Sequence, residues 1–96
     1  MANENNIDQR LKLIKPYLQE KYKVSKVGYF GSYARGEQTE DSDIDILVEF
    51  SQPIGLEFVE LKEYLEDKLG KEVDLVTVNA LKPKLRKTIL KEVIYS

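Results

Sequence analysis

The fold is decided within residues 24–48, which read VSKVGYFGSYARGEQTEDSDIDILV. The first seven residues are rich in β-branched and aromatic side chains and predict a strand over 24–30. Gly31 interrupts this pattern, and the short helix that follows can end abruptly at Gly36. Ile44, Ile46 and Val48 alternate with Asp43, Asp45, Leu47 and Glu49, which predicts a second strand with one acidic edge.

Outside this stretch, hydrophobic periodicity predicts three longer helices and a third strand. They are a helix over 7–22 that contains Pro16, a helix over 56–69 that ends at Gly70, a strand over 73–78, and a helix over 83–93 that begins with Pro83. A proline inside a helix either kinks it or delays its start. The order of elements predicts an α/β (α+β) fold in which helices pack on a sheet of three or more strands. Without repeats or linker-like runs, 1–96 reads as a single domain.

The composition restricts the chemistry that the chain can perform. The sequence has 96 residues with no Cys and no His, which removes the usual zinc ligands and any Cys-His or Ser-His nucleophile. The formal charge is +4 over 1–36, −10 over 37–67 and +4 over 68–96. An acidic centre argues against direct binding of a nucleic acid backbone and favours binding of a cation. No apolar run is long enough to cross a membrane and the N-terminus does not resemble a signal peptide, so we expect a cytoplasmic protein.

Three aspartates are candidate metal ligands. Asp43 and Asp45 are two positions apart on a predicted strand, so both side chains leave the same face. Asp74 is the only acid within the third strand, and the three carboxylates can converge if the two strands are neighbours. Such an oxygen site suits Mg²⁺ or Mn²⁺. The alternative is that these acids line a solvated sheet edge. A calcium-binding loop is excluded, because Ile46 and Gln52 stand where Gly and Glu are required.

The bend at Gly31 and Ser32 is a candidate phosphate-binding turn. Backbone N–H groups and the serine hydroxyl can donate to an anion here, and glycine lets a phosphate approach the chain closely. Arg35 is three residues further on, where it can reach phosphate or pair with Asp41 or Asp43. The alternative is an ordinary helix cap, and no dinucleotide-binding or Walker A glycine pattern is present.

Taken together, these stretches resemble a known family. The segment Gly31-Ser32-Tyr33-Ala34-Arg35-Gly36 is followed, after five residues, by Ser42-Asp43-Ile44-Asp45. This spacing resembles the signature of the nucleotidyltransferase (DNA polymerase β-like) superfamily, and it is most similar to the minimal nucleotidyltransferase, or MntA-like antitoxin, branch. The resemblance covers residues 24–78 and implies a small nucleotidyltransferase fold with a mixed β-sheet.

The resemblance also implies residue roles. It makes ATP the substrate and two Mg²⁺ ions the cofactors, with Mn²⁺ as the alternative metal. The implied roles are β- and γ-phosphate binding for Gly31 and Ser32, further nucleotide contacts for Arg35 and Ser42, metal binding and catalysis for Asp43 and Asp45, and completion of the metal site with deprotonation of the acceptor for Asp74. Attack on the α-phosphorus would release pyrophosphate, and catalysis would rest on charge neutralisation and positioning.

The acceptor is expected to come from another protein. The chain ends about twenty residues after Asp74, too few for the helical domain that larger relatives add. The resemblance implies a HEPN-family ribonuclease toxin as partner, AMP transfer to a toxin tyrosine, and a hetero-oligomer, with a homodimer as the alternative. The last predicted helix carries a basic face that either docks an acidic partner or the nucleotide, or is simply solvated. Its basic residues are Lys82, Lys84, Arg86, Lys87 and Lys91.

Two other functions stay open at this point. The protein can be a non-catalytic antitoxin that occludes a HEPN partner, or a nucleotidyltransferase for a small-molecule acceptor. The three mutually repelling carboxylates favour catalysis over a pure scaffold.

Overall fold

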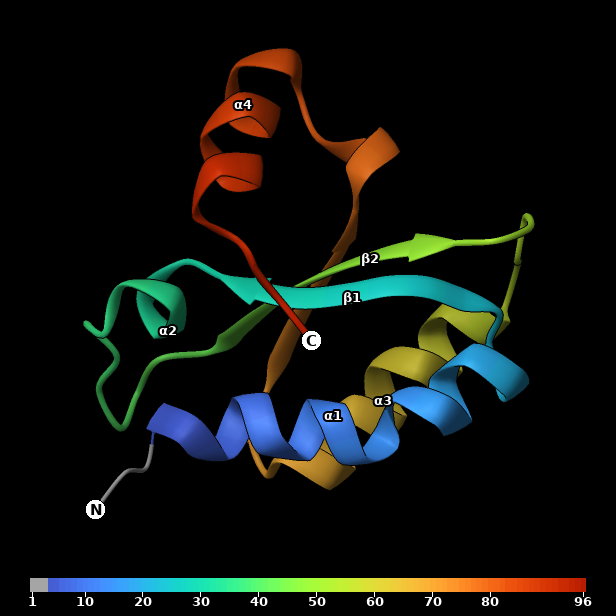
Figure 1. Ribbon diagram of the computed structural model, residues 1–96, viewed down its shortest axis with the longest axis horizontal. Helices are drawn as coiled ribbons and strands as arrows, with labels where there is room; N and C mark the ends of the chain where they lie inside the picture. Colours follow the sequence, from blue (N-terminus) through green and yellow to red (C-terminus); the bar gives the residue numbers. More distant parts are fainter. Residues whose placement is uncertain (1–3) are drawn as a thin grey trace.

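A four-stranded mixed sheet forms the centre of the computed structural model, which describes residues 4–96 (Figure 1). The strands are β1 (Val24–Phe30), β2 (Ile44–Phe50), β3 (Val73–Thr77) and β4 (Ile94–Tyr95). Their order is β3-β2-β1-β4, with β2 and β3 parallel and β1 antiparallel to both β2 and β4. The prediction of a mixed sheet with flanking helices is therefore confirmed.

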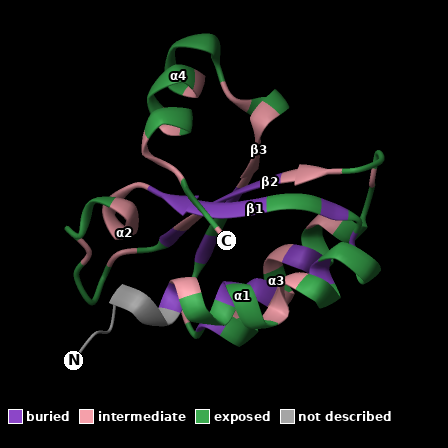
Figure 2. Cartoon of the chain, in the orientation of Figure 1, coloured by how far each residue is buried: buried purple, intermediate pink, exposed green. Residues whose placement is uncertain are grey.

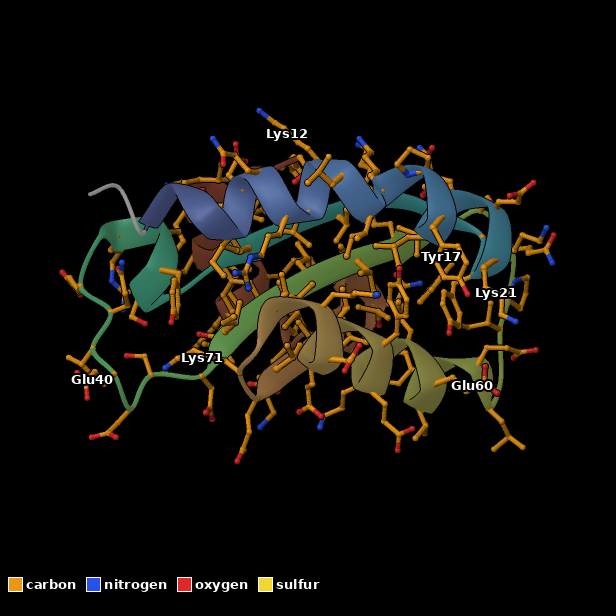
Figure 3. All side chains as sticks on the ribbon, turned by 90° about the horizontal axis from the view of Figure 1, so that it is seen from below. Lys12, Tyr17, Lys21, Glu40, Glu60 and Lys71 are labelled. Carbon is orange, nitrogen blue, oxygen red and sulfur yellow. The ribbon has the colours of Figure 1, made fainter. Side chains whose placement is uncertain are left out.

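The helices lie on both sides of this sheet. They are α1 (Glu4–Lys21), α2 (Ser32–Arg35), α3 (Glu57–Leu69) and α4 (Pro83–Glu92), with a short 3₁₀ turn at Val78–Ala80. Helices α1 and α3 run side by side across one face, while α4 stands on the opposite side and α2 follows the end of β1 (Figures 1 and 3). Across residues 4–96, no helix has the length and apolar character needed to cross a membrane.

The hydrophobic core lies between the sheet and the α1–α3 layer (Figure 2). Its residues come from the apolar stripes of both helices and from alternate positions of β1, β2 and β3. The fully buried side chains of this core are Leu11, Leu18, Val27, Ile44, Ile46, Val48, Leu61 and Leu65, and Leu47 is fully buried outside it. Each stabilises the fold by roughly 1.5–3 kcal/mol relative to an exposed position. No residue of α4 is buried, so this helix is held by contacts outside the core.

The C-terminal end departs from the sequence prediction. The predicted helix over 83–93 ends at Glu92, and the chain then pairs with β1 as the short strand β4. Gly28 makes this pairing close, because a Cβ at that position would lie 2.7 Å from the Ile94 carbonyl oxygen. An edge strand of two exposed residues leaves almost no pattern in the sequence, which explains why periodicity missed it.

Smaller differences concern the other ends of elements. Helix α1 begins before the predicted residue 7 and continues through Pro16 to Lys21. Pro16 is exposed, so the carbonyl that loses its N–H partner can be hydrated instead. The third strand ends at Thr77, and Val78 begins the 3₁₀ turn. Gly70 ends α3 with a φ of +73°, as predicted for a glycine cap.

Candidate functional site

The parallel strands β2 and β3 bring two of the predicted site residues together. Asp45 and Asp74 are direct Cα partners in the β2–β3 register. Ile44 and Ile46, on either side of Asp45, are both buried in the core below the sheet. Because side chains alternate along a strand, Asp45 leaves the opposite face, and its register partner Asp74 shares that face. Two carboxylates therefore stand side by side on the face away from α1 and α3.

Asp43 lies two residues before Asp45, immediately ahead of β2, and is exposed. Asp45 itself is half-buried. Burial raises the pKa of the Asp45 carboxyl above its usual value, and the charges of Asp74 and Asp43 raise it further, whereas Arg35 acts in the opposite direction. The three acids are therefore close enough to repel one another, and a bound cation would relieve this repulsion.

The donor set fits a hard divalent cation by its chemistry, because every candidate ligand is a carboxylate oxygen. As placed in residues 4–96, no three acidic side chains converge closely enough to hold one ion. Asp43 and Asp74 are exposed, so their carboxylates can reorient toward the half-buried Asp45. The metal assignment of these three residues stays a prediction.

Gly31 lies directly after β1, beside Asp45. Its φ of +72° lies in a region that favours glycine. A Cβ built on Gly31 would also overlap the Asp45 carboxylate oxygen Oδ2. The Ala34 and Arg35 N–H groups donate to the Gly31 carbonyl at 3.0 and 3.1 Å, which forms the single turn of α2. The predicted bend is thus packed directly against a predicted metal ligand.

Ser32 follows Gly31 and begins α2. Among residues 4–96, no group accepts a hydrogen bond from its hydroxyl, and the side chain is only half-buried. The hydroxyl is therefore available to an external acceptor beside Asp45. Its phosphate-binding role stays a prediction.

Arg35 forms ion pairs within the chain. Its Nε donates to Glu37 Oε1 at 3.0 Å, and its Nη1 donates to both carboxylate oxygens of Glu92 at 3.0 and 3.2 Å. The hydrogen bonds that the guanidinium donates to Glu37 and Glu92 raise its pKa above the usual value. The pairing with Asp41 or Asp43 that the sequence allowed is not formed. Within residues 4–96, Nη2 has no hydrogen-bond partner and remains free for an anion.

Glu92 is a site residue that sequence reasoning missed. Besides Arg35, its Oε2 accepts a hydrogen bond of 2.7 Å from the Gly31 N–H. The available signal was weak: Glu92 is the single acid in a C-terminal helix that carries four basic residues. Its carboxylate belongs to the site only because β4 brings the end of α4 back to β1.

Ser42 stabilises the loop that leads into β2. Its Oγ accepts a hydrogen bond from the Thr39 N–H at 2.9 Å, and its carbonyl accepts one from Lys71 Nζ at 3.1 Å. Lys71 also donates to the Glu40 carbonyl, and Figure 3 shows both residues beside this loop. These hydrogen bonds hold the loop in place, and the loop in turn sets the position of the Asp43 backbone. A nucleotide contact by Ser42 stays a prediction.

A cavity of about 920 Å³ lies elsewhere on the molecule. It is lined by the later residues of β2 and β3, by the 3₁₀ turn and by the loop before α3, including Phe50, Ile54, Phe58 and Leu75. Asp45 and Asp74 stand near the beginnings of the same two strands and do not line it. The cavity and the carboxylate site are thus separate.

Comparison with known proteins decides the family. A model of the nucleotidyltransferase domain matches residues 11–96. The chain belongs to the nucleotidyltransferase domain family. The chain is also similar to the protein adenylyltransferase MntA of Thermococcus cleftensis, to which it is 49% identical over 96 residues, covering 99% of this chain and 97% of the relative.

Similar solved structures agree with this assignment. One described as a minimal nucleotidyltransferase is 37% identical, with a TM-score of 0.83, and the match covers 98% of this chain and 96% of that one. Another, a toxin–antitoxin with AMP-PNP, is 29% identical, with a TM-score of 0.68, and the match covers 98% of this chain and 72% of that one. The family expected from the sequence motifs is therefore confirmed, and with it the nucleotidyltransferase fold.

Proposed function

We propose that this protein transfers AMP from ATP to a hydroxyl group of a partner protein, with Mg²⁺ as the metal. The observation that carries the proposal is the direct pairing of Asp45 with Asp74 beside the Gly31 turn. Membership of the nucleotidyltransferase family supports nucleotidyl transfer. The name of the Thermococcus cleftensis relative, a protein adenylyltransferase, supports AMP as the group transferred and a protein as the acceptor.

In this proposal, different residues bind the metal and the phosphates. Asp43, Asp45 and Asp74 would hold two Mg²⁺ ions, for which Mn²⁺ can substitute. When bound, the ions neutralise charge on the triphosphate and polarise its phosphoryl oxygens. Gly31 and Ser32 would bind the β- and γ-phosphates, Ser32 through its unpaired hydroxyl and Gly31 by shaping the turn, because the Gly31 N–H already donates to Glu92. Oxygen ligands and hydrogen-bond donors are thereby gathered on the same side of the sheet.

The transfer step balances without a further reactant. The acceptor oxygen attacks the α-phosphorus of ATP, an O–P bond forms, and the bond from the α-phosphorus to the bridging oxygen of the β-phosphate breaks. Pyrophosphate leaves with that electron pair, and Asp74 takes the proton of the acceptor hydroxyl. Arg35, through its free Nη2, and Ser42 are the further nucleotide contacts of this proposal.

The proposed partner is a HEPN-family toxin, with a tyrosine hydroxyl as acceptor and a hetero-oligomer in the cytoplasm as the working form. The similarity to a toxin–antitoxin structure with AMP-PNP supports a toxin as the partner, and the resemblance of the sequence motifs supplies the HEPN class. The site lies open on one face of a small sheet, so a second protein can supply the acceptor. In this proposal residues 1–96 act as one domain.

The test is a transfer assay with a purified HEPN-family toxin, Mg²⁺ and ATP labelled on the α-phosphate. We expect label on the toxin with the unsubstituted protein and a loss of at least a hundredfold in Asp45→Asn and Asp74→Asn. Asp41→Asn is the matched control, because Asp41 is an exposed acid of the loop before β2 with no side-chain hydrogen bond or ion pair among residues 7–96. It should transfer label normally.

The other outcomes identify the alternative functions. Tight toxin binding without label would overturn the proposal in favour of an antitoxin that acts by occlusion. Label found only on small-molecule acceptors would overturn the protein acceptor. Equal transfer by the Asp45 and Asp74 variants would remove these aspartates from the reaction.

A further inference from the structure

Glu92 connects the two ends of the turn that contains Ser32. Its Oε2 accepts the Gly31 N–H at 2.7 Å, and both of its oxygens accept from Arg35 Nη1. Gly31 directly precedes α2 and Arg35 is the last residue of α2. One carboxylate thus bridges the beginning and the end of the segment that presents Ser32.

The sheet, and not a flexible side chain alone, places Glu92 at this position. In the antiparallel β1–β4 pair, Tyr29 is opposite Ile94. Continuing this register by two residues brings Gly31 opposite Glu92. The Glu92 side chain is only 22% exposed, compared with 63% for Glu37, the other partner of Arg35. Glu92 is therefore placed at the end of α4 by the pairing of β4 with β1.

Gly31 is consequently held from two sides. The Asp45 carboxylate fills the space where a Gly31 side chain would lie, and the Glu92 carboxylate binds its N–H. In the sheet order β3-β2-β1-β4, Asp45 reaches Gly31 from the β2 side and Glu92 from the β4 side. Glu92 thus holds the turn from the side opposite Asp45 and Asp74. The Ser32 hydroxyl, which has no acceptor among residues 4–96, remains available.

Considered by itself, the negative charge of Glu92 opposes nucleotide binding. Glu92 adds a negative charge near Asp45, and a triphosphate would bring more. By Coulomb's law, removal of this charge would then tighten nucleotide binding. If Glu92 instead holds the turn in position, a shorter side chain with the same charge loosens the turn and weakens nucleotide binding.

We propose that Glu92 is a positioning residue of the nucleotide site, which fixes Gly31 and Arg35 so that Ser32 faces the phosphates beside Asp45. This inference rests on the proposed function. It assigns a role to the end of α4, a helix without buried residues, and it makes the β1–β4 pairing part of the site.

The experiment compares two substitutions of Glu92, one that removes the charge of the side chain and one that shortens it. E92Q keeps the length and an acceptor for the Gly31 N–H but loses the charge, whereas E92D keeps the charge but is one methylene too short to bridge Gly31 and Arg35. E37A is the matched control, because Glu37 contacts Arg35 only and is exposed. The measurements are the Kd for AMP-PNP with Mg²⁺, the Tm, and hydrogen exchange of the Gly31 amide.

We expect E92D to weaken AMP-PNP binding at least tenfold and to speed exchange of the Gly31 amide. E92Q should bind within threefold of the unsubstituted protein, and E37A within twofold. The proposal is overturned if E92D binds normally while folded, or if E92Q binds markedly tighter, which would make Glu92 a competitor of the phosphates. Failure of the unsubstituted protein to bind AMP-PNP would overturn the proposed function as well, whereas normal binding by E92D would overturn this inference only.

Discussion

Asp45 and Asp74 are direct partners across the parallel strands β2 and β3, so two negative charges share one face of the sheet. Parallel strands are about 4.8 Å apart, and paired side chains on one face cannot avoid each other. Asp45 is half-buried as well, and its carboxylate lies against Gly31. The arrangement is unfavourable for folding alone, as is typical of a site that binds a cation.

The first prediction concerns stability in the absence of metal. Asp45→Asn keeps the size of the side chain and removes one of the repelling charges, so its Tm in EDTA should equal or exceed that of the unsubstituted protein. Thermal unfolding followed by circular dichroism in EDTA measures this. A Tm several degrees lower would indicate that the carboxylate is structural and would weaken the metal-site proposal.

The pH dependence of this difference follows from the raised pKa of Asp45. Between the ordinary carboxyl pKa and the raised folded value, the folded protein binds more protons than the unfolded chain, so its stability falls as the pH rises through this window. The full penalty applies above the raised pKa. The advantage of Asp45→Asn should therefore be largest near neutral pH, shrink as the pH falls through the raised pKa, and be gone below about pH 4, near the usual Asp value. An advantage that grew toward acid pH would rule out burial and repulsion of the charged carboxylate as its cause.

A second prediction compares two glycines of similar backbone geometry. Gly31 and Gly36 have φ values of +72° and +73°, so alanine at either position is strained by about 1 kcal/mol. Around Gly36, no described atom lies within 4 Å of an added Cβ, whereas at Gly31 the Cβ would overlap Asp45. Gly31→Ala should therefore lose roughly 1–3 kcal/mol more than Gly36→Ala.

Urea unfolding of both variants measures the free-energy difference. The unsubstituted protein and Gly36→Ala provide the reference for the backbone term alone. Equal losses in the two variants would show that the contact between Gly31 and Asp45 does not constrain the turn.

The sequence predicted the site best where local patterns fix geometry. Alternation along β2 puts Asp45 opposite the buried Ile44 and Ile46, and a glycine-serine bend after a strand predicts the turn at Gly31. That Asp74 would be a neighbour depended on strand order, which alternation does not determine. The structure supplied it through the parallel β2–β3 pairing.

The parts that sequence reasoning missed depend on contacts between distant residues. Glu92 reaches Gly31 because of the β1–β4 register, and β4 comprises two exposed residues whose pairing no local pattern marks. Arg35 shows the same limit. The sequence offered Asp41 and Asp43 as nearby partners, but the structure pairs Arg35 with Glu37 and with Glu92, which is 57 positions away.

A third prediction tests the core under the site. Leu65 of α3 is fully buried below the sheet, so Leu65→Ala leaves a cavity and should cost about 2–5 kcal/mol of unfolding free energy. Leu56 is the matched control, because it is 87% exposed just before α3, and Leu56→Ala should change stability by less than about 0.5 kcal/mol. Chemical denaturation measures both. Similar losses would mean that α3 does not pack as described.

The last prediction concerns ligand-linked stability, which reports binding without turnover. Mg²⁺ with AMP-PNP should raise the Tm of the unsubstituted protein, because a ligand at a hundred times its Kd stabilises the folded state by about 2.7 kcal/mol. Neither Mg²⁺ alone nor AMP-PNP in EDTA should give the full shift, since the triphosphate needs the metal beside Asp45 and Asp74. Asp45→Asn should lose most of the shift and Asp41→Asn should keep it. The same shift in EDTA, or in Asp45→Asn, would place the nucleotide somewhere other than this pair of aspartates.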